Sequence, residues 1–577
     1  MGRDGEKAAN DEVIALTSRK WKEKKMYSDK ENINILTSLL LAHGVRHAVV
    51  CPGSRNAPIT HNLCEASGIS CESVTDERSA AFIALGKAQA SGEPVVVCVT
   101  SGSALVNTLP AVVEAWYQHV PIIVVSADRP EAMIGQLQGQ TMPQRRTLEA
   151  FWAKEVSLPE PHDDVERWYC NRLANEALCA MRQSGGGPIH INVPISEPLF
   201  NFTTHELPVE RSVNLVDNHL WQIQLTKEFL SSSRPMMVVG QLQGHVARRV
   251  GDAIRHLGEN VVVLAEQLAT DKMKPCHFDE ALIEIGELEA YKPDFIIYIG
   301  DTLVSKRAKH FLQHCHPRRC VVVNASGELT DVTMNATDVV ACGVDDVVDS
   351  LCEEMDNRGV KPSKEALAFR DRWSVALAKC SARCERYEPA YSQMMAAKRL
   401  CERTNEQECC MQFANSSAVR LGQLYSTHHI YVNRGVNGIE GSLSTAVGFA
   451  SEKEVPVYCV IGDLSFFYDQ NALWNGVDKK NLRVVMLNNG GGGIFHQLHG
   501  LGQSPYRDSF VAAAHTASAK GVCEATGVAY KAARNEEELR EGIGWITSQH
   551  SVGPLLLEVF TDAETDAREY EKYFEIR

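Results

Sequence analysis

No apolar run in this chain of 577 residues approaches the roughly 20 residues that a membrane-spanning helix needs. The sequence also lacks a signal-peptide core near its start, and it contains no basic tract. A formal net charge of −15 argues against a general nucleic-acid-binding protein. We therefore expect a cytoplasmic protein that binds small molecules and has no nucleic-acid partner and no membrane span.

The sequence also lacks the regular cysteine spacing of a disulfide framework and the glycine motif of dinucleotide binding. The 18 cysteines are scattered without regular spacing, which indicates reduced and mostly buried thiols. Cys315-His316 with Cys320, and Cys409-Cys410, lack the paired spacing of a zinc site, so we expect structural roles for them. The segment Gly240-Gln-Leu-Gln-Gly244 is not the three-glycine fingerprint of NAD binding. An NAD-dependent enzyme is therefore disfavoured.

Alternating buried strands and helices fill most of the chain. Hydrophobic residues make up 44% and charged residues 23%, which is typical of a globular protein. The length predicts roughly three to four domains. Strands followed by helices, with polar residues at the strand ends, predict an α/β fold of three doubly wound parallel-sheet domains. The expected segments are a mobile extension (1–25), a first domain (26–205), a central domain (206–375) and a third domain (376–577).

The stretch Val455–Phe495 organises the third domain. It contains buried strands over 455–461 and 482–487, which lead to Gly462-Asp463 and to Asn488-Asn489 with four glycines. Open parallel sheets bind ligands at the carboxyl ends of their strands. A carboxylate, an amide and free backbone carbonyls suit a divalent cation that also holds phosphates. The alternative is an ordinary βαβ unit whose loops are merely polar.

Other strand ends carry polar side chains too. In the first domain a strand over 47–51 leads to Ser54 and Arg55, which suit an anion, although a surface salt bridge is the alternative for Arg55. A short strand over 73–78 and a helix over 79–90 place Glu77 at their junction, where the alternative is a helix-capping charge. Lys306-Arg307 follows a strand of the central domain as a paired basic site, with a solvated helix face as the alternative.

Several motifs in a fixed order carry a family resemblance. They are Cys-Pro-Gly-Ser-Arg (51–55), Asp-Glu-Arg-Ser-Ala-Ala-Phe (76–82), Thr-Ser-Gly (100–102), Ala-Asp-Arg-Pro (127–130), Asn-Arg-Gly (433–435), Gly-Ile (438–439) and Gly-Asp-Leu-Ser-Phe (462–466). After about Met26 the chain resembles the 2-succinyl-5-enolpyruvyl-6-hydroxy-3-cyclohexene-1-carboxylate synthases of menaquinone biosynthesis, within the thiamine diphosphate-dependent superfamily. It departs from the usual pattern at Leu464, where the superfamily has glycine, and at Gly490, where the family often has asparagine.

The resemblance implies thiamine diphosphate and Mg2+ (or Mn2+) as cofactors. By similarity, the catalytic residue Glu77 contacts the pyrimidine ring nitrogen, in the first domain. The implied metal ligands are Asp463, Asn489 and the Gly491 carbonyl, in the third domain. The implied cofactor-binding residues are Thr100, Ser101, Gly102, Ser416, Gly438, Ile439, Gly462, Leu464, Ser465 and Ile494, with Ile439 as a stiff wedge between the cofactor rings.

The resemblance also implies the reaction: decarboxylation of 2-oxoglutarate and addition of the succinyl carbanion equivalent to isochorismate. Both substrates are dicarboxylates, and arginine suits bidentate carboxylate binding. The implied substrate-binding residues are Ser54, Arg55, Arg129, Gln140, Lys306, Arg307, Arg420, Arg434 and Phe495. In this superfamily the active site lies between subunits, so a homodimer or a dimer of dimers is expected. The alternatives are an acetolactate synthase-type enzyme using pyruvate, with a flavin in the central domain, and a binding protein that keeps the fold without catalysis.

Overall fold

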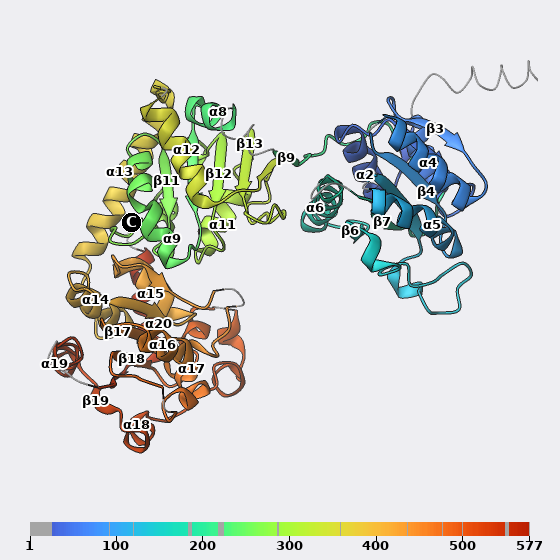
Figure 1. Cartoon of the computed structure of the whole chain (residues 1–577). Helices are drawn as coiled ribbons and strands as arrows, with labels where there is room; N and C mark the ends of the chain where they lie inside the picture. Colours follow the sequence, from blue (N-terminus) through green and yellow to red (C-terminus); the bar gives the residue numbers. More distant parts are fainter. Residues whose placement is uncertain are drawn as a thin grey trace, which may run out of the picture. The chain divides into compact units, whose positions relative to one another are not determined.

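The computed structural model describes residues 26–91, 93–118, 120–182, 187–216, 224–285, 288–357, 359–434, 437–475, 477–498, 500–548 and 553–575. The predicted mobile extension, residues 1–25, lies outside these ranges. The chain divides into two compact units, which are described separately (Figure 1). The first unit comprises the chain up to Leu215 with two short segments, 327–329 and 337–339, and the second unit comprises the remainder.

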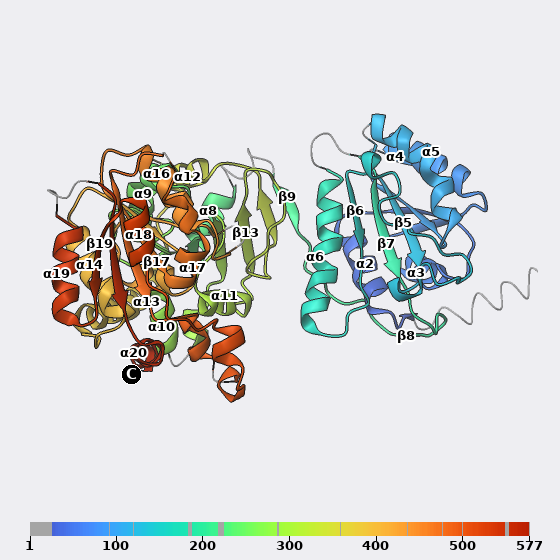
Figure 2. The same cartoon turned by 90° about the horizontal axis from the view of Figure 1, so that it is seen from below.

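The first unit contains a six-stranded sheet in the order β3-β2-β4-β5-β7-β6, and all its strands pair in parallel. Its core lies on both faces of the sheet: α2, α3 and α6 cover one face, and α4 and α5 cover the other (Figure 2). Strands β1 and β8 form a separate antiparallel pair. The bounds are β1 (Tyr27–Ser28), α2 (Glu31–Ala42), β2 (His47–Val50), α3 (Ala57–Glu65), β3 (Ser70–Ser73), α4 (Glu77–Ser91), β4 (Val95–Val99), α5 (Ser103–Gln118), β5 (Ile122–Asp128), β6 (Lys154–Ser157), α6 (Asp164–Ala180), β7 (Ile189–Pro194) and β8 (Phe202–Thr204).

Two more sheets belong to the second unit, except that the first unit includes residues 214–215 of β9 and 338–339 of β14. In the central sheet β11, β10, β12 and β13 pair in parallel in that order, and β14 and β9 complete its six strands. The bounds are β9 (Asn214–Val216), α8 (Thr226–Ser231), β10 (Pro235–Val239), α9 (Gly244–Gly258), β11 (Val262–Ala265), α10 (Phe278–Glu284), β12 (Phe295–Ile299), α11 (Lys306–Gln313), β13 (Arg319–Val323), β14 (Asp338–Val340), α12 (Val344–Asp356) and the long α13 (Lys364–Arg386).

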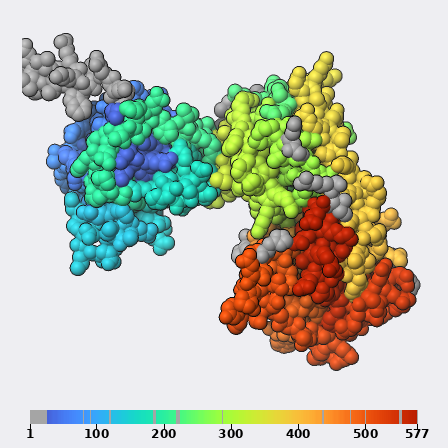
Figure 3. All heavy atoms as spheres, turned by 180° about the vertical axis from the view of Figure 1, so that it is seen from behind, coloured from blue at the N-terminus to red at the C-terminus, as the bar shows by residue number. Residues whose placement is uncertain are grey.

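The third sheet has the order β16-β15-β17-β18-β20-β19, again with parallel pairing throughout. Figure 3 shows the last segment of the chain, in red, at the surface of the second unit. The bounds are α14 (Gln393–Thr404), β15 (Cys410–Phe413), α15 (Ser417–Tyr425), β16 (Ile430–Tyr431), α16 (Ser442–Ser451), β17 (Val457–Gly462), α17 (Asp463–Tyr468), β18 (Leu482–Asn488), η6 (Gly493–Gln497), α18 (Lys520–Thr526), β19 (Ala529–Ala533), α19 (Glu536–Ile546), β20 (Leu555–Phe560) and α20 (Ala563–Glu575).

Three parallel sheets flanked by helices confirm the predicted fold class. One local prediction was wrong. The strand expected over 73–78 ends at Ser73, and helix α4 begins at Glu77 rather than at residue 79. The backbone carbonyl of Asp76 already accepts a helical hydrogen bond from Ala80 (2.9 Å), and acidic side chains are favourable in a first helical turn. No helix among the described residues has the length and apolarity needed to cross a membrane.

Candidate active site

Asp463 lies at the carboxyl end of β17, and residues 488–493 begin at the carboxyl end of β18. Together they are here called the metal loop, and they are joined by hydrogen bonds. Helix α17 begins at Asp463, a residue that is 2% exposed. Its Oδ2 atom accepts hydrogen bonds from the backbone N–H groups of Gly490 (2.8 Å) and Gly491 (2.9 Å). Its Oδ1 atom accepts one from the N–H of Leu464 (2.7 Å). The loop after β18 is therefore folded around this carboxylate.

Asp463 is a buried anion without a lysine or arginine partner in the part of the chain that the structure describes. Burial raises the pKa of its carboxyl group, and the backbone hydrogen bonds and His515 oppose that rise. The Nε2 atom of His515 lies 3.4 Å from Oδ2 of Asp463 and has no hydrogen-bond partner among the described residues. Burying a carboxylate is costly unless a cation meets it. These observations fit a metal ion at this position.

The two other predicted metal ligands lie in the same loop. The Nδ2 atom of Asn489 donates to Oδ2 of Asp566 (3.0 Å), which orients the amide. The carbonyl of Gly491 accepts a hydrogen bond from the N–H of Gly493 (3.0 Å) and keeps a second lone pair. Gly491 has φ +154°, and a Cβ atom there would lie 2.7 Å from the Ala512 carbonyl. One carboxylate, one amide oxygen and one backbone carbonyl suit Mg2+, which completes its shell with phosphate and water oxygens.

Predicted cofactor contacts surround the ends of β15 and α17. Ser416 has φ +72°, a strained conformation for a residue with a side chain. Ile439 is apolar yet 42% exposed, and its carbonyl accepts a hydrogen bond from the hydroxyl of Ser465. Asn415 donates from Nδ2 to the carbonyl of Gly438 (2.7 Å), which fixes the approach to Ile439. An exposed apolar side chain on a pinned backbone fits a residue that contacts a cofactor ring.

In the first unit, Glu77 stands in the first turn of α4. Its Oε2 atom accepts a hydrogen bond from Nδ2 of Asn107 in α5 (3.0 Å). The predicted segment Thr100-Ser101-Gly102 connects β4 to α5. Gly102 has φ +81°, its N–H donates to Oε1 of Gln144 (2.7 Å), and a Cβ atom there would lie 3.2 Å from the Gln140 carbonyl. The structure thus brings Gly102 and Gln140 together.

The predicted substrate residues of the first unit are held in different ways. Arg129 follows β5, and its Nε atom donates to the Gly139 carbonyl (3.3 Å), next to Gln140. Ser54 is exposed, whereas Arg55 is 6% exposed. The Arg55 guanidinium donates to the Ile195 carbonyl (3.0 Å) and to Oε1 of Glu197 (2.8 Å). Arg55 therefore forms a salt bridge, in agreement with the alternative interpretation given for it. Its contact with substrate stays a prediction.

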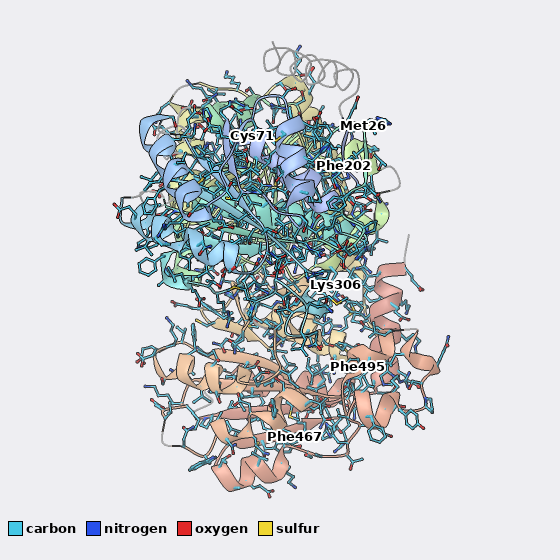
Figure 4. The ribbon with its side chains drawn as sticks, turned by 90° about the vertical axis from the view of Figure 1, so that its right-hand side faces the viewer. Met26, Cys71, Phe202, Lys306, Phe467 and Phe495 are labelled. Atoms are coloured by element: carbon cyan, nitrogen blue, oxygen red, sulfur yellow. The ribbon has the colours of Figure 1, made fainter. Side chains whose placement is uncertain are left out.

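In the second unit, a cavity of about 470 Å3, here called the cationic cavity, contains several predicted residues. Lys306 and Arg307 open helix α11, and Arg420 reaches the cavity from α15. Oδ2 of Asp279 accepts a hydrogen bond from Nη1 of Arg307 (2.6 Å). Figure 4 labels Lys306 and Phe495 on the ribbon. The residues that line the cavity include Glu266, His277, Asp279, Glu280, Lys306, Arg307, Arg420, Gln423, Ile494, Leu498, Tyr570 and Phe574.

Arg434 and Phe495 are predicted substrate residues that do not line this cavity. Nη1 of Arg434 donates to Oδ1 of Asn415 (3.3 Å), and its Nε atom has no hydrogen-bond partner among the described residues. Burial lowers the pKa of Arg434, and the neighbouring charge of Arg420 lowers it further. Phe495 lies against Gly492, where a Cβ atom would come within 2.7 Å of the Phe495 ring.

Sequence reasoning missed the side chains that hold these groups in place. Asp566 follows β20, the neighbour of β18, so the rule of strand ends could have found it. Glu266 follows β11, and its carboxylate accepts hydrogen bonds from the N–H groups of Val304 (2.6 Å) and Ser305 (2.8 Å). Burial raises the pKa of Glu266 to about 7, with Asp279 adding to the rise. His515 lies in an irregular segment where no sequence pattern marks it.

Fold and site together define a thiamine diphosphate-dependent enzyme. Two family models match the chain: the thiamine pyrophosphate enzyme N-terminal TPP binding domain over residues 33–149, and the corresponding C-terminal TPP binding domain over residues 413–559. The first match contains Glu77, and the second contains the metal loop.

Relatives with a specific name narrow the class. The 2-succinyl-5-enolpyruvyl-6-hydroxy-3-cyclohexene-1-carboxylate synthase of Bacteroides thetaiotaomicron is 41% identical over 564 residues, which covers 95% of this chain and 99% of that protein. Synthases of the same name from Bacteroides fragilis and Phocaeicola vulgatus are 41% and 40% identical, with the same coverage of 95% and 99%. The chain belongs to this synthase family.

Proposed function

We propose that this enzyme decarboxylates 2-oxoglutarate and adds the resulting succinyl unit to isochorismate. The product is 2-succinyl-5-enolpyruvyl-6-hydroxy-3-cyclohexene-1-carboxylate, formed with release of CO2 in menaquinone biosynthesis. The observation that carries this proposal is the convergence of Lys306, Arg307 and Arg420 on one cavity. Full-length similarity to synthases that carry this product in their name supports the same assignment.

The cations of the cationic cavity suit dicarboxylate substrates. Arg420 and Arg307 can each bind a carboxylate through two parallel hydrogen bonds, and Lys306 adds a third positive charge. Asp279 already pairs with Arg307, so it limits how far that guanidinium moves. The carboxyl groups of Glu266, Asp279 and Glu280 line the same cavity, so its charge is mixed. A second carboxylate, which 2-oxoglutarate has and pyruvate lacks, would pair with Arg420 or Lys306, and on this ground we favour 2-oxoglutarate over the pyruvate of an acetolactate synthase-type enzyme.

Apolar side chains share the cavity with these cations. Ile494, Leu498 and Phe574 line it, and the Phe574 ring centroid lies 4.9 Å from the Arg307 guanidinium carbon. Such a wall excludes water around a bound substrate. Removing water strengthens the attraction between carboxylate and cation and favours loss of CO2, because decarboxylation disperses the negative charge.

The cofactor would be held by residues of two subunits. In the second unit Asp463, Asn489 and the Gly491 carbonyl would hold Mg2+ and through it the diphosphate, and Ile439 would contact the rings. When bound, thiamine diphosphate supplies the electron sink that lets a 2-oxo acid lose CO2 and its reacting carbon attack an electrophile. Glu77 would share a proton with the pyrimidine ring nitrogen, and the hydrogen bond from Asn107 would orient its carboxyl group.

A homodimer, or a dimer of dimers, is the assembly that the superfamily resemblance supports. In such an assembly Glu77 comes from one subunit and the metal loop from its partner. Each family model matches only one of these two regions, which agrees with an active site built from two separate domains.

The test is a reaction with purified protein, thiamine diphosphate and Mg2+. We expect CO2 release from 2-oxoglutarate, and with isochorismate an adduct whose mass equals the sum of both substrates less CO2. Pyruvate in place of 2-oxoglutarate serves as the control for the rival enzyme class. An acetolactate-type product from pyruvate, with no adduct from 2-oxoglutarate, would refute the proposal.

A further inference from the structure

The wall of the cationic cavity contains a histidine to which no role has been assigned above. His277 lines the cavity together with Lys306, Arg307 and Arg420. It directly precedes helix α10 and has φ +54°, a left-handed conformation that residues with a side chain rarely adopt. Strained backbone conformations are concentrated at functional sites, and they persist only where the surrounding structure enforces them. The contacts of the His277 ring show what this residue can do.

A buried carboxylate holds one side of that ring. Nδ1 of His277 lies 2.8 Å from Oε1 of Glu280, and the two side chains are 4% and 2% exposed. The same oxygen accepts a hydrogen bond from the hydroxyl of Tyr573 in α20 (2.9 Å). Burial acts to raise the pKa of Glu280, but the hydrogen bond and the charge of His277 outweigh it and hold that pKa below its ordinary value. Because a carboxylate only accepts hydrogen bonds, Nδ1 of His277 carries a proton.

The other nitrogen of the His277 ring is open. Nε2 has no hydrogen-bond partner among the described residues, and it is not one of the unpaired polar atoms that are cut off from solvent. The residue lines the cavity, and Nδ1 is occupied by Glu280. Nε2 is therefore the ring atom that can exchange a proton with a molecule bound in the cavity.

A histidine of the first unit shows the purely structural form of such a pair. Nδ1 of His190 lies 2.8 Å from Oε1 of Glu155, and its Nε2 lies 2.7 Å from Oγ of Ser126. His190 is 0% exposed, so both ring nitrogens are satisfied inside the core. His277 has the carboxylate partner but not the second one. The pair of His277 and Glu280 thus resembles a histidine–carboxylate dyad with a free proton-transfer position.

The proposed addition to isochorismate needs a proton donor. In the product the succinyl group is on ring carbon C2, and the neighbouring C1 carries the carboxylate. When the reacting carbon of the succinyl unit bonds to C2, the C1–C2 double bond of isochorismate breaks and its electron pair moves to C1, where the carboxylate disperses it. C1 must then take up a proton, so the overall reaction consumes one proton for each CO2 released. Histidine is the side chain best suited to donate a proton near neutral pH.

We propose that His277 is the catalytic acid that protonates C1 after the carbon–carbon bond has formed, and that Glu280 positions it. Protonated His277 keeps its Nδ1–H on Glu280 and donates the Nε2 proton to C1, and water returns a proton to Nε2 before the next turnover. The cations of the same cavity would bind the carboxylate attached to C1 and so keep that carbon in the cavity that His277 lines. This inference rests on the proposed function and adds a residue to it.

The test compares two reactions of His277→Gln loaded with thiamine diphosphate and Mg2+. The first is adduct formation from 2-oxoglutarate and isochorismate. The second is CO2 release from 2-oxoglutarate with hexacyanoferrate(III), an oxidant that takes electrons from the succinyl unit and so requires no protonation of C1. We expect kcat for adduct formation to fall about 100-fold with little change in the KM for isochorismate, because a general acid acts in the transition state. CO2 release with the oxidant should keep most of its rate, which also shows that the variant is folded and binds the cofactor.

Glu280→Gln tests the positioning role. Its amide oxygen can still accept the Nδ1–H of His277, but it has no charge to stabilise the protonated ring. The kcat for adduct formation should fall about tenfold, and CO2 release with the oxidant should again keep most of its rate. His310→Gln is the matched control, because His310 is an exposed histidine of α11 that does not line the cavity. Its kinetics in both reactions should equal those of the unaltered enzyme.

Three results would overturn the proposal. They are an unchanged kcat for adduct formation in His277→Gln, with or without a raised KM for isochorismate, an equal loss of both reactions in that variant, and a comparable loss of adduct formation in His310→Gln. Failure of the proposed function would be recognised separately, because the unaltered enzyme itself would then form no adduct from 2-oxoglutarate and isochorismate.

Discussion

The metal loop and the cationic cavity both lie at carboxyl ends of parallel strands in the second unit, but their polar groups are held differently. Asp463 is fixed by three backbone N–H groups and is almost fully buried. Lys306 and Arg307 stand on the exposed start of a helix, and Arg307 pairs only with the side chain of Asp279 among the contacts described here. A carboxylate held by backbone N–H groups suits a cofactor that remains bound. Cationic side chains on an exposed helix suit substrates that bind and dissociate in each turnover.

The first unit contributes the predicted catalytic residue Glu77, which is held differently from the groups of the metal loop and the cationic cavity. Among the described residues, Glu77 accepts a side-chain hydrogen bond from Asn107, and it stands at the start of a helix. Substitution of Glu77 should have the largest effect on turnover. Glu77→Gln should lower turnover about 100- to 10,000-fold, because it removes the acid that shares a proton with the cofactor. Binding of thiamine diphosphate, followed by fluorescence titration, should persist.

Glu72→Gln is the control for this prediction. Glu72 lies on β3 and pairs with Lys87 at the surface (2.8 Å), so its loss should leave turnover unchanged. Normal turnover in Glu77→Gln would contradict the role assigned to Glu77.

A change in the metal loop should act on the cofactor instead. Asp463→Asn removes the buried charge and should weaken Mg2+-dependent binding of thiamine diphosphate about 10- to 100-fold. Titration of the cofactor at fixed Mg2+ measures this. Asp469→Asn, at the other end of α17, is the control and should leave cofactor affinity unchanged. Unaltered cofactor affinity in Asp463→Asn would show that the metal site lies elsewhere.

A change in the cationic cavity should spare the cofactor. Arg420→Ala should raise the KM for 2-oxoglutarate about tenfold, because one charge-assisted carboxylate contact is lost. Steady-state kinetics with separate cofactor titration checks this. Arg399→Ala, which removes a surface arginine paired with Glu402 and Glu388, is the control. An equal loss of cofactor affinity would show that Arg420 belongs to the metal-loop region.

The smallest effect should come from pH. The pKa of Glu266 is raised to about 7, so its carboxyl is neutral below that pH and charged above it. The substrate stays dianionic throughout, because ordinary carboxyl pKa values are near 4. A new negative charge beside the cavity should therefore raise the KM for 2-oxoglutarate about three- to tenfold as pH rises through 7. Other ionisable groups that influence Glu266 or respond to its charge are Asp279, Arg434, Lys309, Cys276 and Tyr298.

Glu266→Gln gives the control for this pH dependence. Its amide oxygen can still accept a hydrogen bond from the N–H of Val304 or of Ser305, and the side chain cannot ionise. The KM should then be nearly constant across the same pH range. A rise in KM that persists in Glu266→Gln would assign the titration to another group.

The sequence allowed prediction of the three sheets because buried strands are nearly continuous apolar runs with polar ends. It also placed Asp463 and Asn489 at the ends of neighbouring strands, because Gly462-Asp463 and Asn488-Asn489 directly follow such apolar runs. It did not show that Arg55 pairs with Glu197, more than a hundred residues later, or that Asp566 orients Asn489. These are long-range side-chain contacts, which local pattern does not encode. The start of α4 was misplaced because acidic residues at a strand–helix junction fit both elements.

The proposed dimer places Glu77 and Asp463 in one active site built from two chains. The most direct measurement co-produces the Glu77→Gln and Asp463→Asn variants and assays the mixture. Random dimers would have one unaltered site in half of the molecules, so we expect about a quarter of the normal activity, far above either variant alone. Activity no higher than the mean of the two variants measured separately would contradict a shared site.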